Sequence, residues 1–199
     1  MIKKENIPNF LCYLRIAAAP FVLALLVISA LFTGGGYVTF TVLSGVVFGA
    51  AMITDALDGH YARKYGLISD KGKILDPLAD KVLILGAMFA FMLRELIVGA
   101  LGLWFIIPLS IIVAREVTVS LLRKYTAKKG AVIGASIWGK VKTCVQSVAV
   151  AISYFAALFN LNTVIFAVIC LAGAVTLISL FPYLKMYLTK LKELEGKNV

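Results

Sequence analysis

The stretch TDALDGHYARKYGLISDKGKILDPLADK (54–81) is a charged connection between two long apolar segments of the chain. Two pairs of aspartates lie near its ends, and the members of each pair are three or four positions apart. Residues with this spacing project from the same face of an α-helix. We expect one pair to end a helix, the other to begin the next, and residues 59–75 to form a turn that makes the helices antiparallel. Four carboxylates would then converge: Asp55, Asp58, Asp76 and Asp80.

The composition on both sides of this stretch is that of a membrane protein. Of the 199 residues, 61% are hydrophobic and only 15% are charged, which is too apolar for an ordinary soluble protein. A transmembrane helix needs about 20 consecutive apolar residues. The sequence therefore predicts an all-α, polytopic membrane protein with one domain over residues 1–199 and six transmembrane helices: 10–32, 37–55, 76–93, 99–122, 143–159 and 163–184.

The first and fourth of these segments have unusual features. Lys3 and Lys4 precede the first apolar run, as in a cleaved signal peptide. The run is longer than the apolar core of a typical signal peptide and contains Arg15, so we interpret it as a membrane span. In the fourth segment we expect Pro108 to kink the helix, because proline removes a backbone hydrogen bond.

The basic residues predict how the chain is oriented in the membrane. They gather at the termini and in the two long loops on one side, whereas the opposite side has little more than Arg94, next to Glu95. By the positive-inside rule, both termini and these loops are cytoplasmic. We expect a multi-pass protein of the plasma membrane. The net charge of +10 suits insertion topology and contact with anionic membrane lipids, and no nucleic-acid-binding motif accompanies it.

The histidine and cysteine content limits the possible metal sites. His60 is the only histidine, which rules out a multi-histidine site. The cysteines have no CxxC spacing, so we interpret them as small buried apolar residues. They are Cys12, Cys144 and Cys170.

The four aspartates predict a site for hard divalent cations. Carboxylates that converge in a partly desolvated place repel one another unless cations neutralise them, and an all-oxygen set suits Mg²⁺, Mn²⁺ or Ca²⁺. Pairs of such ions catalyse phosphoryl displacement. Helix capping explains one or two aspartates near helix ends, but four at paired spacings beside membrane spans favour a functional site. Gly59 and Ala62 permit close approach of a ligand, and the forked cation of Arg63 suits phosphate oxygens.

The spacing of these residues resembles the signature of the CDP-alcohol phosphotransferases. Every fixed position of that signature is present in the pattern Asp55-x2-Asp58-Gly59-x2-Ala62-Arg63-x8-Gly72-x3-Asp76-x3-Asp80. Members of that family transfer a substituted phosphate from a CDP-linked donor to an alcohol and release CMP. The resemblance implies a six-helix membrane bundle, a homodimer, and an active site that opens to the cytoplasm.

The resemblance also implies roles for the signature residues. The four aspartates would hold two divalent cations, Mg²⁺ or Mn²⁺, and Asp80 would also be the general base. The CDP-lipid pocket would be formed by Gly59, Ala62 and Arg63, with Gly72 permitting close helix packing. Asp70 and Lys81 lie outside the signature, and we interpret them as ordinary surface or pairing charges.

Two further stretches bear on the acceptor alcohol. AREVTVSLLRKY (114–125) and GASIWGKVKTCVQ (134–146) place basic residues near the cytoplasmic ends of apolar segments. Topology alone explains such charges in general, but an intramembrane arginine with nearby lysines can bind an anionic acceptor. This pairing resembles the phosphatidylglycerophosphate synthase branch, whose acceptor is sn-glycerol 3-phosphate. The acceptor-phosphate residues would be Arg115, Arg123, Lys140 and Lys142, supported by Asn9, Arg15 and Glu116. Cys12 stands where that branch has threonine.

The reaction implied by the resemblance transfers a phosphatidyl group from CDP-diacylglycerol to glycerol 3-phosphate, giving phosphatidylglycerophosphate and CMP. Inositol phosphate, serine and phosphatidylglycerol are alternative acceptors for the same chemistry. A divalent-cation transporter is the alternative outside this class. A transporter would spread polar residues along its spans at midplane depth, whereas here they cluster near one face, beside Arg63, which would repel cations.

Overall fold

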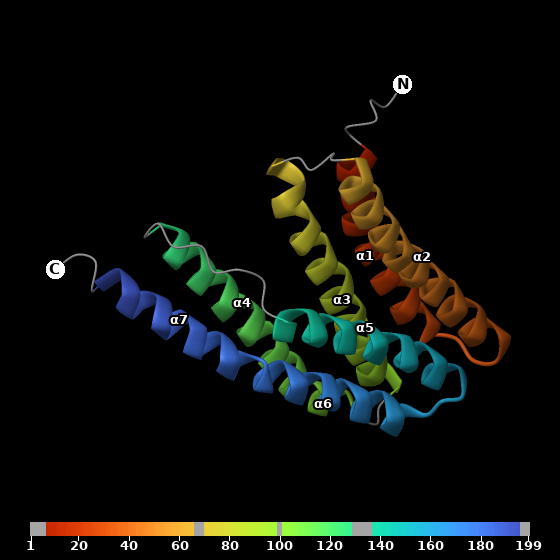
Figure 1. The fold of residues 1–199 in the computed structure, drawn as a ribbon. Coiled ribbons are helices and arrows are strands. Elements are labelled where there is room, and N and C mark those ends of the chain that lie inside the picture. The colour runs from red at the N-terminus through yellow and green to blue at the C-terminus, as the bar shows by residue number, and fades with distance from the viewer. Residues whose placement is uncertain (1–6, 66–69, 99–100, 129–136, 196–199) are drawn as a thin grey trace.

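The computed structural model describes residues 7–65, 70–98, 101–128 and 137–195, and these ranges contain helices joined by short turns (Figure 1). Within them, the side chains of residues 7–9, 56–65, 70–74, 76, 128 and 191–195 lie outside the description. No strand occurs in the described ranges, as the all-α prediction requires.

Three long helices form one half of the bundle: α1 (Ile7–Ser29), α2 (Gly35–Tyr65) and α3 (Asp70–Val98). α1 packs against both α2 and α3, and α2 and α3 are antiparallel to each other (Figure 1). Gly34 has φ of 59° in the turn before α2, a backbone conformation that glycine adopts without steric cost. The predicted turn at residues 59–75 is wrong, because α2 continues to Tyr65 and α3 begins at Asp70. The good helix formers Ala62, Arg63 and Lys64 favour this extension of α2.

The fourth helix has its proline in the first turn instead of in its middle. The 3₁₀-helix η2 (Gly102–Phe105) leads directly into α4 (Ile106–Lys128), and Pro108 lies in the first turn of α4. The predicted kink at Pro108 is therefore wrong. The first amide groups of a helix have no carbonyl partner within it, so proline costs nothing at that place.

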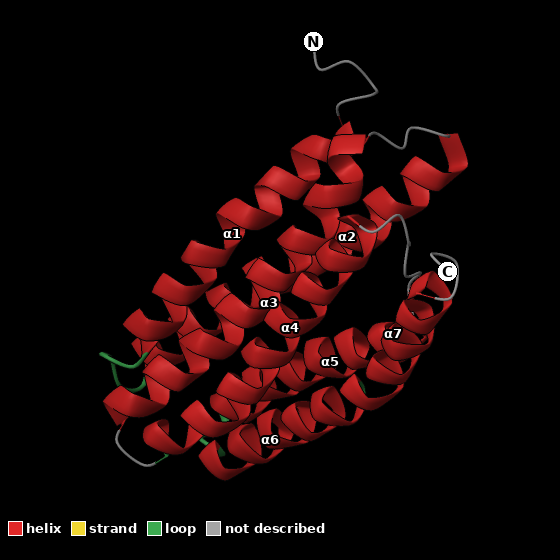
Figure 2. Ribbon diagram, turned by 90° about the vertical axis from the view of Figure 1, so that its left-hand side faces the viewer, coloured by secondary structure: helices red, strands yellow, loops and turns green. Residues whose placement is uncertain are grey.

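The last third of the chain contains α5 (Ile137–Leu158), α6 (Asn162–Ile178) and α7 (Leu180–Glu195). The predicted single segment 163–184 is interrupted between α6 and α7, which follow one another along one edge of the bundle (Figure 2). Pro182 explains this break, because it has no N–H to donate to the carbonyl of Ile178. Asn160 forms the turn between α5 and α6 with φ of 54°.

Five helical segments of the described residues are long and apolar enough to cross a membrane: Phe10–Ser29, Gly35–Asp55, Gly102–Ala127, Ile137–Leu158 and Asn162–Lys190. The protein is thus of the multi-pass membrane type. α3 is not among the five, because charged residues lie close to both ends of its apolar stretch: Lys81, Arg94 and Glu95. It has 29 residues, which is long enough for a span at about 1.5 Å per residue, so six spans stay a prediction.

The interior of the bundle is built around one face of α3. Leu83, Ala87 and Phe91 recur every four residues and are fully buried, and the ring of Phe91 lies 5.0 Å from that of Tyr154 on α5. Many large apolar side chains are instead exposed on the outer surface, as a lipid-facing surface requires. The interpretation of the cysteines as buried holds for Cys12 but is wrong for Cys144, which is exposed.

A buried polar cluster joins the helices at the end of α3 that lies far from Asp80. Arg94 and Glu95 form an ion pair, and both side chains are fully buried. Arg94 also donates to the hydroxyl of Tyr37 on α2, at 2.6 Å, and to Asn162 on α6, at 3.3 Å. The Tyr37 hydroxyl in turn donates to the carbonyl of Ala157 on α5. The Arg94 guanidinium and the Tyr37 hydroxyl together therefore connect four helices at this end of the bundle.

Candidate active site

Three helices meet at Arg15. Its guanidinium, which is fully buried on α1, donates through Nη1 to Asp55 on α2 and to Oδ1 of Asp80 on α3. The distance to Asp80 is 2.7 Å. The two carboxylates are about one-third exposed, at 32% and 29%, so a ligand can reach them from the side away from Arg15. The structure thus brings together one aspartate from each predicted pair, on a residue that the sequence indicated only as possible support.

The remaining signature residues are placed only by their backbone. Asp58 lies one helical turn beyond Asp55 on α2, and Asp76 lies one turn before Asp80 on α3. Their side chains lie outside the described part of the structure, and five further predicted site residues are likewise placed only by their backbone. α2 carries Gly59, Ala62 and Arg63, α3 carries Gly72, and α1 carries Asn9.

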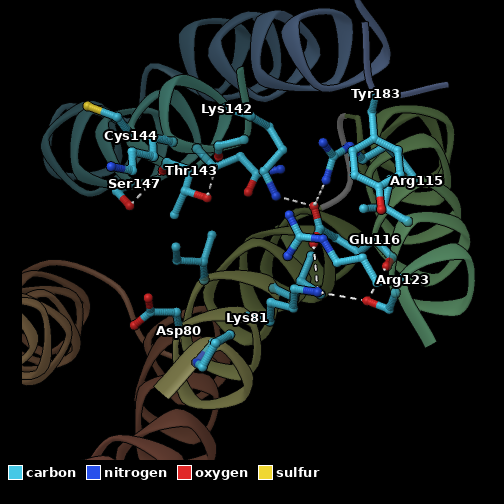
Figure 3. A pocket seen from close by; sticks show the side chains of 18 of the residues that line it. Asp80, Lys81, Arg115, Glu116, Arg123, Lys142, Thr143, Cys144, Ser147 and Tyr183 are labelled. Atoms are coloured by element: carbon cyan, nitrogen blue, oxygen red, sulfur yellow. Dashed lines mark hydrogen bonds and ion pairs between the residues drawn. The ribbon is translucent and has the colours of Figure 1, made fainter. Parts of the chain in front are cut away.

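A cavity of about 540 Å³ opens beside Asp80 between α3, α4, α5 and α7 (Figure 3). Its wall includes all four residues predicted to bind the acceptor phosphate. The described lining contains five cationic side chains and two carboxylates, so an excess of positive charge faces the cavity. These charged residues are Asp80, Lys81, Arg115, Glu116, Arg123, Lys140 and Lys142.

Glu116 is the centre of the cationic wall. Its carboxylate accepts from Lys142 on α5, from Lys81 on α3 at 3.1 Å, and from Arg115 on its own helix at 3.3 Å. Glu116, Arg115 and Lys142 are all buried, at 5%, 7% and 4% exposure. Because a buried charge is costly without a partner, this arrangement lets three cations lie close together beside the cavity.

The other two predicted acceptor residues are at the mouth of the cavity. Arg123 and Lys140 are exposed, and the Arg123 guanidinium lies over the ring of Tyr183 on α7, 5.7 Å from its centre. Lys140 and Lys142 were expected just before the fifth span, but α5 begins at Ile137 and both lie inside it. The early start of α5 directs the Lys142 side chain into the bundle, where it reaches Glu116.

The cavity is also lined by Lys81, Ser120 and Tyr183, for which no sequence motif indicated a site role. Lys81 directly follows Asp80, and this adjacency was the one available signal. Ser120 and Tyr183 reach the cavity through contacts between distant helices, for which the sequence holds no local signal.

The carboxylates described at this site fit a divalent cation. Asp55 and Asp80 supply oxygen donors on adjacent helices, and both remain partly exposed. Oxygen donors of this kind are preferred by Mg²⁺ and Mn²⁺. The Arg15 guanidinium already holds the two carboxylates together, which reduces their mutual repulsion.

A sequence profile of a known protein family matches residues 5–180 of the chain. The profile is that of the CDP-alcohol phosphatidyltransferases, and the chain belongs to this family.

Several curated relatives share most of their length with this chain. A protein of Mycoplasma pneumoniae is 36% identical over 172 residues, covering 80% of this chain and 72% of the relative. One of Rickettsia bellii is 33% identical over 185 residues, covering 91% and 94%. One of Bacillus subtilis is 35% identical over 150 residues, covering 73% and 74%. All three bear the name CDP-diacylglycerol–glycerol-3-phosphate 3-phosphatidyltransferase.

Proposed function

We propose that the protein transfers a phosphatidyl group from CDP-diacylglycerol to sn-glycerol 3-phosphate and releases CMP. The observation that carries this proposal is that Asp80 and a group of cationic side chains line the same cavity. A phosphorylated alcohol needs both features, a carboxylate near its hydroxyl and cations near its phosphate. The names of the relatives support the same donor and acceptor.

Two divalent cations, Mg²⁺ or Mn²⁺, would be held by Asp55, Asp58, Asp76 and Asp80. When bound, they neutralise the charge of the diphosphate and of the departing CMP. Arg63 would bind the diphosphate from the end of α2, where Gly59 and Ala62 leave room for the nucleotide. Gly72 would permit close packing at the start of α3.

Asp80 would act as the general base. It accepts the proton of the C1 hydroxyl of glycerol 3-phosphate as the hydroxyl oxygen bonds to the lipid-linked phosphorus. The bond from that phosphorus to CMP breaks in the same displacement, so the products are phosphatidylglycerophosphate and CMP. The Arg15 guanidinium holds the Asp80 carboxylate in place, and such positioning contributes much of the rate in phosphoryl transfer.

The acceptor phosphate would bind to Arg115 and Lys142, with Arg123 and Lys140 at the mouth of the cavity. A forked guanidinium and compact ammonium groups together satisfy a phosphate as it loses water. The lipid tails of the donor would lie in the bilayer beside the apolar outer surface. We further propose a homodimer in the plasma membrane with the cavity open to the cytoplasm, on the basis of the charge distribution.

The test is an assay of CMP release by the purified protein in detergent. It uses CDP-diacylglycerol with glycerol 3-phosphate, inositol phosphate, serine or phosphatidylglycerol, each with Mg²⁺, with Mn²⁺ and with EDTA. We expect CMP release with glycerol 3-phosphate and either ion, and none with EDTA. Release only with one of the other three acceptors would refute the acceptor assignment, and full activity in EDTA would refute the metal assignment.

A further inference from the structure

We propose that the ion pair between Lys81 and Glu116 sets the length of the phosphorylated alcohol that the protein accepts. This inference rests on the proposed function, because it concerns the same cavity. Lys81 and Glu116 would be positioning residues that fix the span between the Asp80 carboxylate and the cationic wall.

The first observation is that Lys81 attaches α3 to α4 at two points. Its ammonium group lies 3.1 Å from Oε2 of Glu116 and donates to Oγ of Ser120 at 2.9 Å. The Ser120 hydroxyl donates its own proton to the backbone carbonyl of Glu116, so its oxygen accepts from Lys81. Glu116 and Ser120 are one turn apart on α4, and the two contacts therefore fix both the distance and the register between the helices.

The second observation is that η2, which packs against α3 and leads into α4, holds the two helices together at one end, whereas the cavity separates them beside Lys81. Direct packing between the two helices is slight, and the cavity lies between them. Figure 3 shows Lys81 between Asp80 and Glu116, with its contacts to α4 crossing the space between the helices. Because few apolar contacts define this spacing, the polar contacts of Lys81 have a large share in it.

The third observation is that both ends of the acceptor depend on this pair. Asp80, which would take the hydroxyl proton, is the neighbour of Lys81 on α3. Arg115 and Lys142, which would bind the phosphate, are bound by Glu116. An acceptor must place its hydroxyl at one end and its phosphate at the other at the same time. A misplacement of about 1 Å is enough to cost about 100-fold in rate, so this span selects for acceptor length.

Variants of Lys81 and Glu116 can separate the effect of the spacing between α3 and α4 from the effect of the net charge of the cavity. Lys81 and Glu116 carry opposite charges, so the double variant Lys81→Gln/Glu116→Gln keeps the net charge of the cavity while it removes the ion pair. The single variants change that net charge in opposite directions. If all three variants lose the selection for acceptor length, the connection between the helices is what produces that selection, because the net charge differs among the variants.

The experiment compares two acceptors with the full chain in detergent. The quantity is the ratio of kcat/KM for glycerol 3-phosphate to kcat/KM for 3,4-dihydroxybutyl phosphate, which keeps the secondary hydroxyl and has one more carbon between the phosphate and the attacking hydroxyl. We expect each variant to lower this ratio about tenfold, with the double variant no worse than the singles, because residues that act as a unit are not additive. Lys81→Arg retains the ion pair, so the ratio of this variant should stay close to that of wild type. The KM for CDP-diacylglycerol should stay within about twofold of wild type.

Lys124→Gln, an exposed lysine of α4 outside the cavity, is the matched control and should leave the ratio unchanged. If Lys81→Gln and Glu116→Gln leave the ratio unchanged, including the case in which kcat/KM falls equally for both acceptors, the inference is overturned. The proposed function would still stand. If one of these variants does not fold, the other and Lys81→Arg still decide between the outcomes. A wild-type protein that releases no CMP with glycerol 3-phosphate would overturn the proposed function itself.

Discussion

Arg15 and Asp80, which are 65 positions apart in the sequence, are joined by a partly buried hydrogen bond of 2.7 Å. The same guanidinium nitrogen binds Asp55, so one side chain of α1 holds two carboxylates from two other helices. The carboxylates therefore have a cation from the protein itself, independent of any bound ion. We therefore expect the stabilisation of the protein by divalent ions to depend on whether Arg15 is present.

Replacing Arg15 with Met should lower the melting temperature in EDTA by about 5 °C, because two neighbouring carboxylates lose their shared cation. Adding Mg²⁺ should recover more of the melting temperature in the variant than it adds in wild type, since the ion then neutralises the same groups. Thermal unfolding with and without Mg²⁺ measures both effects. Equal Mg²⁺ stabilisation of variant and wild type would show that Arg15 and the ion act at separate places.

Replacing Asp80 with Asn tests the general-base assignment. The amide keeps the size of the side chain but cannot take a proton, and general bases typically contribute about 10²–10⁴-fold to the rate. We expect kcat to fall by that amount, with a much smaller change in the affinity for CDP-diacylglycerol. The comparison needs kcat from CMP release and the Kd for Mg²⁺ in the same preparations. Equal losses in kcat and in Mg²⁺ affinity would make Asp80 a metal ligand without a base role.

The Arg94–Glu95 pair allows stability to be changed without changing the chemistry. Arg94→Met leaves Glu95 buried without its cation and removes the contacts to Tyr37 and Asn162. We expect the melting temperature to fall by about 10 °C, since breaking a buried ion pair costs about 3–5 kcal/mol. Arg94→Met/Glu95→Gln should be less destabilised than the single variant.

Well below the melting temperature, kcat/KM of Arg94→Met should stay within about threefold of wild type, because the pair lies at the other end of α3 from Asp80. CMP release at low temperature measures this. A loss of more than about 100-fold would mean that the far end of α3 controls the catalytic geometry.

Local sequence patterns predicted the helices and the aspartate pairs, because apolar runs and three- or four-residue spacing depend only on neighbouring positions. The break between α6 and α7 had a local signal as well, in Pro182, but a continuous apolar run concealed it. Arg15 and Glu116 were indicated only as support, although Arg15 joins two carboxylates and Glu116 joins three cations. Their importance comes from which helices lie side by side, and hydrophobic periodicity does not specify this when every helix is apolar on most of its surface.

Arg115, the buried cation beside Glu116, is expected to bind the phosphate of the acceptor. A phosphate with nearly two negative charges needs several cations as it loses water, whereas a neutral alcohol such as glycerol does not. Arg115→Ala should therefore raise the KM for glycerol 3-phosphate at least tenfold, with little change in the KM for CDP-diacylglycerol. Lys at this position should rescue only part of the loss, because it restores the charge without the planar fork that binds two oxygens.

Initial rates of CMP release at varied acceptor and donor concentrations separate the two KM values. Lys124→Ala is the control, as an exposed basic residue on the same helix that does not line the cavity. If Arg115→Ala behaves like this control, the buried cations serve membrane topology and bundle stability instead of acceptor binding. In that case the aspartate site would still carry the transferase chemistry, and the acceptor would have to be bound elsewhere on the cavity wall.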